Sequence, residues 1–245
     1  IYPISLFGTS TPNIGSGITA EVLSLDMESG VTLTNNGSLS ITSGDLNINT
    51  GATVNGNGQY DLNGNFVING GTFNPGTSTV TMSGTANKLI AFDPVSFYNL
   101  VINKTVNNRV SIVSNVTVTN ALTIQSGDLL VAGFNPSSLI CPQLNVPGGS
   151  ELNVSGSLTL TAGDLVINSG ATALGNGQYS IAGNFVNEGT FTPGTSTVSL
   201  TGTGTQGISP NPTSFYNLTV NKASGLAQLG TSISIANTLD MVSGN

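Results

Sequence analysis

The chain has 245 residues, of which 4 are Lys or Arg, 11 are Asp or Glu and none is His, so its formal net charge is −7. This balance argues against nucleic-acid binding, because phosphate neutralisation needs basic side chains, and the lack of His removes the commonest general base and zinc ligand. The single cysteine, Cys141, cannot form an internal disulfide, and its apolar neighbours predict a small core residue. No apolar run approaches the about 20 residues that span a bilayer.

Residues 1–24 precede the repeats and begin with an unusually apolar stretch. Five large apolar side chains lie near its start: Ile1, Tyr2, Ile4, Leu6 and Phe7. An exposed apolar strand beside an open sheet edge invites pairing with another strand. We therefore predict that residues 1–24 form a joining or capping segment. The first residue is not Met, and we expect a mature chain from which an export signal has been removed.

Residues 25–125 form the first repeat block and contain short segments in which apolar and polar residues alternate. The clearest of these predicted strands cover 31–33, 39–41, 46–48, 52–54, 60–62 and 66–68. Asn-Gly, Ser-Gly and Gly-Asn steps separate them and permit sharp bends. Successive segments end 6 to 8 residues apart, so three of them would close a coil of about 21 residues.

Residues 126–245 form a second block that repeats the first. The Gly-Asp-Leu triplet at 44–46 returns at 163–165, Pro-Gly-Thr-Ser-Thr-Val at 75–80 returns at 193–198, and Ser-Phe-Tyr-Asn-Leu at 96–100 returns at 214–218. The Ser-Gly pair at 29–30 matches 126–127 at an offset of 97, whereas the Gly-Asp-Leu triplets are 119 apart. The difference, 119 − 97 = 22 residues, predicts one inserted coil near 132–153.

These observations predict an all-β fold: a parallel β-solenoid, or β-helix, with about 21–22 residues per coil and two long internal repeats. An antiparallel β-sandwich is the main structural alternative, but its turn signals come roughly every 8 to 12 residues. Helices are disfavoured because no apolar spacing of three and four residues recurs.

The repeated motifs resemble those of β-strand-repeat surface proteins of bacteria. The motifs are Gly-Thr-Phe-x-Pro-Gly-Thr-Ser-Thr-Val, then Ser-Phe-Tyr-Asn-Leu-x-(Val/Ile)-Asn-Lys, then Leu-x-(Ile/Met)-x-Ser-Gly. The resemblance covers about residues 18 to 245. It implies large secreted or cell-surface chains of stacked β-coils, often adhesive or structural, and it carries over no catalytic residues.

The acidic residues do not form the pairs that glycoside hydrolysis needs. Asp45 recurs as Asp164, but Asp61 is replaced by Ser180 in the second copy. Calcium sites gather several acidic or carbonyl groups, whereas the Gly-Asp-Leu triplets each offer one Asp, which we expect to cap a turn through its own backbone. The sequence therefore predicts no catalytic, cofactor-binding or metal-binding residues and no enzymatic activity.

The sequence closes on Leu-Asp-Met-Val-Ser-Gly-Asn at 239–245, whose first six residues are a near copy of Leu-Asp-Met-Glu-Ser-Gly at 25–30. We expect an extracellular structural protein whose partner is itself, joined head to tail into a surface filament. The predicted joint sets the apolar start of the chain against a neighbour's last coil at Ile233, Ile235, Leu239 and Met241. The alternatives are a cap folded over its own first coil near 25–33, a piece of a larger surface adhesin that binds surface glycans or cells, and a polysaccharide-degrading β-helix.

Overall fold

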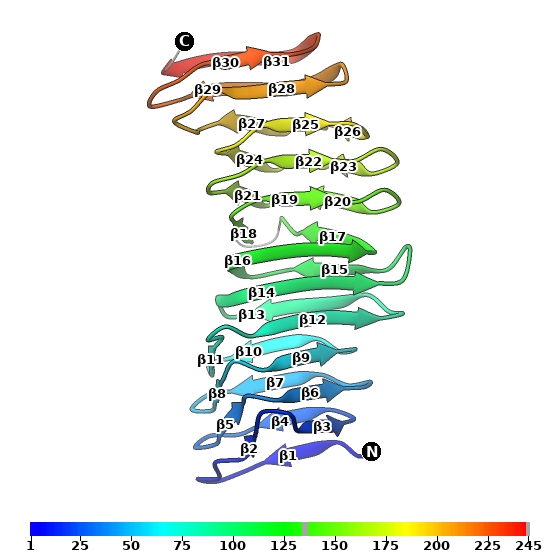
Figure 1. Ribbon diagram of the computed structural model, residues 1–245, viewed down its shortest axis with the longest axis vertical. Coiled ribbons are helices and arrows are strands. Elements are labelled where there is room, and N and C mark those ends of the chain that lie inside the picture. The colour runs from blue at the N-terminus through cyan, green and yellow to red at the C-terminus, as the bar shows by residue number, and fades with distance from the viewer. Residues whose placement is uncertain (134–136, 244–245) are drawn as a thin grey trace.

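The computed structural model describes residues 1–133 and 137–243. The chain is a parallel β-solenoid of about 11 turns with about 21 residues per turn, stacked from the N-terminal end to the C-terminal end of an elongated body (Figure 1). The described residues contain strands but no helix, which confirms the predicted fold class. Residues 134–136 of the predicted inserted coil, and residues 244–245 at the end of the sequence, lie outside the described ranges.

The strands of the described residues form four sheets. The ten-stranded sheet contains β1 Ile4–Leu6, β4 Leu25–Met27, β7 Leu46–Asn49, β10 Phe66–Asn69, β13 Lys88–Phe92, β15 Arg109–Ile112, β17 Asp128–Val131, β20 Glu151–Val154, β23 Thr172–Leu174 and β26 Thr190–Thr192. The twelve-stranded sheet contains β3 Thr19–Val22, β6 Ser38–Ile41, β9 Gln59–Leu62, β12 Thr79–Gly84, β14 Val95–Lys104, β16 Asn115–Ser126, β18 Ser138–Cys141, β21 Ser157–Leu160, β24 Gln178–Ile181, β27 Thr197–Leu200, β29 Thr213–Asn221 and β31 Ile233–Ser243. The four-stranded sheet contains β2 Asn13–Ile14, β5 Thr32–Asn35, β8 Thr53–Asn55 and β11 Thr72–Asn74, and the five-stranded sheet contains β19 Leu144–Val146, β22 Leu165–Ile167, β25 Phe185–Asn187, β28 Gln206–Pro210 and β30 Ala227–Leu229.

The period-two alternation of the sequence forms the core. In β7, Leu46 and Ile48 are fully buried and the two Asn residues of the strand are partly exposed. Tight corners separate the strands. At one of them, Gly56 has φ = +126°, and a Cβ there would lie 1.9 Å from the carbonyl oxygen of Asn35 in the coil below. Only glycine therefore fits this corner.

Two aromatic clusters fill the core, one in each repeat. Phe66 packs edge-to-face on Phe73 and Phe97, with ring centroids 5.1 and 5.0 Å apart. In the second repeat, Phe185 contacts Phe191 and Phe215 at 5.0 and 5.3 Å. The two copies of the sequence thus build nearly the same packing unit twice.

Asparagine side chains also connect the coils. The Asn74 amide donates to the Asn55 side chain at 2.7 Å, and the Asn120 amide donates to the Asn99 side chain at 2.7 Å. Each bond joins residues on successive turns, so side chains add to the backbone pairing along the rod.

The second repeat does not lie on the same faces as the first. β7 belongs to the ten-stranded sheet, but its counterpart β22 belongs to the five-stranded sheet, and β8 of the four-stranded sheet corresponds to β23 of the ten-stranded sheet. At about 21 residues per turn, the offset of 119 residues between the copies equals about 5⅔ turns. The repeat is therefore rotated by one face, or a third of a turn.

Two long strands make this rotation. β14 and β16 have 10 and 12 residues and carry register shifts in the middle of their pairing. On the N-terminal side, β12 pairs with the second half of β14. On the C-terminal side, β18 pairs with the first half of β16, which lies on the neighbouring face. The twelve-stranded sheet thereby passes from one face of the solenoid to the next.

Candidate functional site

The structure separates the two groups of predicted joining residues. Those near the start of the chain lie in the first coil and those near its end lie in the last described coil, at opposite ends of the rod (Figure 1). One molecule cannot bring the two groups together. A joint between them requires two copies.

Residues 1–24 form the first turn of their own solenoid. β1 pairs with β4, so that Ile4 is opposite Leu25 and Leu6 is opposite Met27. Within one chain the segment therefore packs on its own neighbouring coil, as the fold-back alternative expected. Ile1, Tyr2 and Phe7 remain exposed by 65%, 80% and 67%. β1, β2 and β3 are terminal strands of their sheets, so each leaves its outer edge free of pairing within the described residues.

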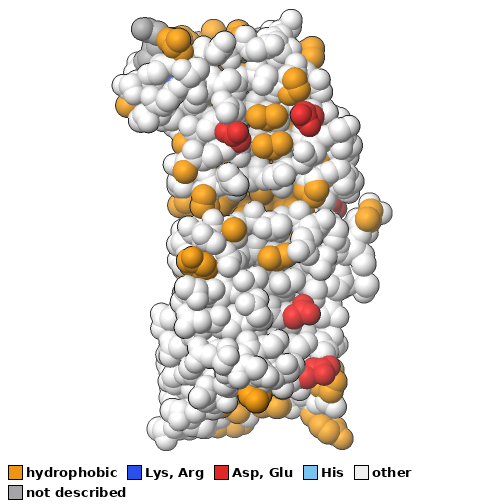
Figure 2. Space-filling model, viewed as in Figure 1, with side chains coloured by type: hydrophobic (Ala, Val, Ile, Leu, Met, Phe, Trp, Pro, Cys, Tyr) orange, Lys and Arg blue, Asp and Glu red, His pale blue; other side chains and the backbone are white. Residues whose placement is uncertain are grey.

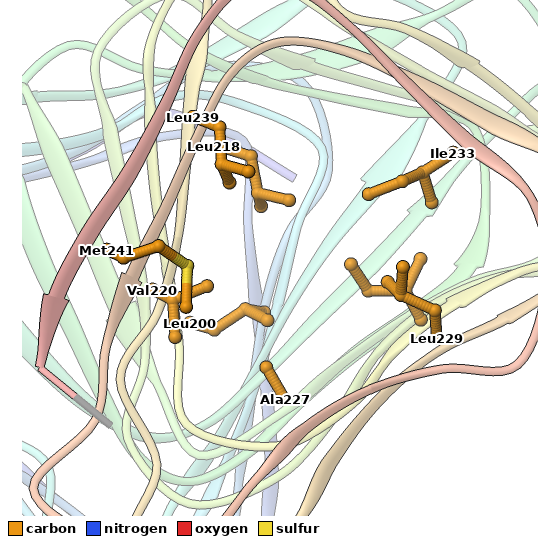
Figure 3. Close-up of a pocket in the computed structure, with 9 residues that line it drawn as sticks. Leu200, Leu218, Val220, Ala227, Leu229, Ile233, Leu239 and Met241 are labelled. Carbon is orange, nitrogen blue, oxygen red and sulfur yellow. The ribbon is translucent and has the colours of Figure 1, made fainter. Parts of the chain in front are cut away.

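The last described coil leaves the core open at its end. Leu239 lies opposite Leu218 and Met241 opposite Val220, which continues the core columns, yet both Leu239 and Met241 are 54% exposed. With Ile233 they border an apolar cavity of about 170 Å³ (Figure 3). Its lining is Leu200, Ile208, Leu218, Val220, Ala227, Leu229, Ile233, Leu239 and Met241. Ile235 belongs to the same coil but does not line the cavity.

The two ends are built from the same part of the repeat. The Leu-Asp-Met-x-Ser motif at 25–29 returns at 239–243, an offset of 214, and the pairing of Ile4 with Leu25 corresponds to that of Leu218 with Leu239. The segment between these strands differs in register, because at the same offset the buried Ile14 and Val22 would match the exposed Gln228 and Ala236. β1 and β4 thus correspond to the second halves of β29 and β31, and in chain order β2 and β3 take the places of β30 and the first half of β31. The shared Leu-Asp-Met-x-Ser-Gly motif is the part of this correspondence that is plain in the sequence.

The side faces of the rod carry few charged groups (Figure 2). Two of the acidic side chains hold corners: Asp45 Oδ1 accepts from the backbone N–H of Asn65 at 2.8 Å, and Asp164 Oδ1 accepts from that of Asn184 at 2.6 Å. The expected contact was with the Asp residue's own turn. The structure shows a bond to the next coil instead, because stacked corners bring that N–H directly over the carboxylate.

Two buried lysines were not found by sequence reasoning. Lys104 and Lys222 are each 1% exposed. Lys104 Nζ donates to the carbonyl oxygen of Ser83, and Lys222 Nζ donates to those of Gly202 and Gly204 at 2.8 Å each. Burial, together with the nearby charge of Lys88, lowers the pKa of Lys104 to about 8, and burial lowers the pKa of Lys222. Their recurrence in the Asn-Lys motif was the only sequence signal.

Within the described ranges, no group of three or more His, Cys, Asp or Glu side chains could hold a metal ion. Nor do these ranges contain a helix with the length and apolar character needed to cross a membrane. Comparison of the chain with models of known protein families, with curated proteins and with solved structures found no significant match. The fold and the surfaces described above are therefore the basis for inferring a function.

Proposed function

We propose that this protein is a non-enzymatic structural rod of the cell exterior, and that copies join head to tail by stacking the first coil of one on the last coil of another. The observation that carries the proposal is the open apolar end of β30 and β31, where Leu229, Leu239 and Met241 are each more than half exposed. A parallel coil placed on this end would add one more buried side chain to each row of core residues that are stacked from coil to coil.

A second copy of the chain has a matching surface. The free edge of its first coil offers Ile4 and Leu6 two positions apart on β1, the same alternation as Leu239 and Met241 on β31. Complete burial of one large aliphatic side chain stabilises by about 1.5–3 kcal/mol, so covering a half-exposed one contributes roughly 1 kcal/mol. Several such side chains and the free backbone groups of three strand edges would contribute together.

The side surface supports a structural rather than a catalytic role. The carboxylates of Asp45, Asp61 and Asp164 bond to backbone and side-chain groups of neighbouring coils, which is a structural rather than a catalytic use of these groups. A surface of hydroxyls and amides with few Lys residues, together with the resemblance to bacterial surface repeats, supports a place outside the cell.

Two neighbouring side chains allow a matched test. Met241 and Val242 are exposed by 54% and 57%, but only Met241 lines the open end of the core. Met241→Asp should abolish end-to-end assembly because it places a charge between stacked coils, whereas Val242→Asp should assemble like the wild type. Electron microscopy and light scattering of purified chains measure this. Fibres with a repeat near the rod length, about 11 turns at about 4.8 Å each, are expected for the wild type. Wild-type chains that remain single rods at high concentration, or Met241→Asp fibres, would contradict the proposal.

A further inference from the structure

A polar hollow of about 500 Å³ opens on the side of the rod in the second repeat. It lies at the corner that follows β21, β24 and β27, where three coils are stacked. Its lining is Thr161, Ala162, Asp164, Ala182, Gly183, Asn184, Thr201, Gly202, Thr203, Gly204 and Thr205. This volume is within the roughly 300–1,000 Å³ of small-molecule sites.

The first repeat has the same corner, and there it is filled. Asn63 corresponds to Ala182, and its amide donates to the carbonyl oxygen of Thr42 at 3.0 Å. Its side chain covers the next coil so closely that a Cβ on Gly84 would lie 1.6 Å from Asn63 Oδ1. Replacement of this amide by the methyl group of Ala182 removes the side chain that occupies the space in the first copy.

The wall of the hollow is held from behind by a buried polar network. Gln206, 1% exposed, accepts from the backbone N–H of Gly202 at 2.8 Å and donates to the carbonyl oxygen of Ile181 at 2.8 Å. Lys222 donates to Gln206 at 2.6 Å as well as to the carbonyl oxygens of Gly202 and Gly204. The first repeat has Lys88 in place of Gln206. The second repeat therefore fixes the loop 201–205 in place, as a preorganised binding surface requires.

The polar side chains at the hollow make fewer hydrogen bonds with each other than their counterparts in the first repeat. There the Asn65 amide donates to Asp45 Oδ2 at 3.0 Å. Within the described residues, the corresponding bond between Asn184 and Asp164 is not formed, although Asp164 Oδ1 still holds the Asn184 backbone. A carboxylate oxygen and an amide N–H at the hollow are thus left for another partner.

We propose that this hollow binds a neutral sugar unit of a glycan. Its lining offers hydroxyl groups, one carboxylate and one amide, which are hydrogen-bonding partners for a polyhydroxyl ligand. The carboxylate of Asp164 disfavours an anion, and as the single charged group of the lining it offers a metal cation only one acidic ligand. The lining contains no large apolar side chain that would select an apolar ligand.

The two repeats supply the test. Saturation-transfer NMR and calorimetry with the methyl glycosides of glucose, galactose, mannose and N-acetylglucosamine measure binding to the wild type, to Ala182→Asn and to Ala121→Asn. Ala182→Asn recreates the filled corner of the first repeat, so it should fold and bind at least tenfold more weakly. Ala121→Asn makes the same chemical change at an exposed position of β16 and should bind like the wild type.

Binding of no glycoside by the wild type, or equal binding by wild type and Ala182→Asn, overturns the proposal. Far-ultraviolet circular dichroism of each variant verifies that the fold is retained. The Met241→Asp variant should bind sugar normally because its substitution lies at the end of the rod. Failure of head-to-tail assembly and failure of sugar binding are thereby distinguished.

Discussion

Substitution of one central aromatic ring in each repeat tests whether the two copies are energetically equivalent and independent. Phe66 and Phe185 are fully buried and each contacts two further rings edge-to-face. Phe→Ala in a core costs about 3–5 kcal/mol, and edge-to-face pairs are worth about 0.5–1.5 kcal/mol beyond area burial. We expect each single variant, Phe66→Ala and Phe185→Ala, to lose about 4 kcal/mol of unfolding free energy, with the two losses equal within about 1 kcal/mol.

The double variant extends this prediction. In a solenoid each coil contacts mainly its neighbours, and several turns separate the two clusters. Costs at distant sites add within about 0.5 kcal/mol, so the double variant should lose about 8 kcal/mol. Urea unfolding followed by circular dichroism gives the midpoints and slopes. A cost below about 1.5 kcal/mol for either ring, or a double variant far from the sum, would refute the packing argument.

Two further predictions concern buried titratable groups. Because the pKa of Lys104 is about 8 in the folded chain and 10.5 in the unfolded one, the unfolded state binds more protons between these values and the unfolding free energy contributed by this group rises with pH across that window. Lys104→Met should remove this rise in urea titrations at graded pH; an unchanged pH profile would contradict the assignment. Burial raises the pKa of the Cys141 thiol to about 12, and the side chain is 0% exposed, so a thiol reagent at pH 8 should label the chain only as fast as it unfolds. Labelling within the mixing time would show that the side chain is accessible.

The alternation of apolar residues was sufficient to predict the strands and the size of a coil. The segments predicted at 46–48, 60–62 and 66–68 match β7, β9 and β10 within one residue. These strands are short and straight, and each turn residue between them permits one bend. Their local pattern therefore determines the coil.

The rotation of the second repeat was not predicted, although its cause is visible in the sequence. Buried positions in β14 run Val95, Phe97, Leu100 and Ile102, so the alternation skips a residue after Phe97. That skip lets one strand cover two faces, and at the same place β16 has one residue more than β14, which gives the register shift in their pairing. The buried lysines and the open corner at Ala182 could not be predicted, because both depend on which side chains of different coils come together.

The rotation by one face determines how this protein presents its surface to its surroundings. A feature that occurs once per repeat points in a direction about a third of a turn away from its counterpart in the preceding copy, as the open corner at Ala182 does relative to the filled corner at Asn63. A flat substrate alongside such a rod would meet the same feature only at every third copy. A mesh that surrounds the rod would meet it at every copy, from all sides.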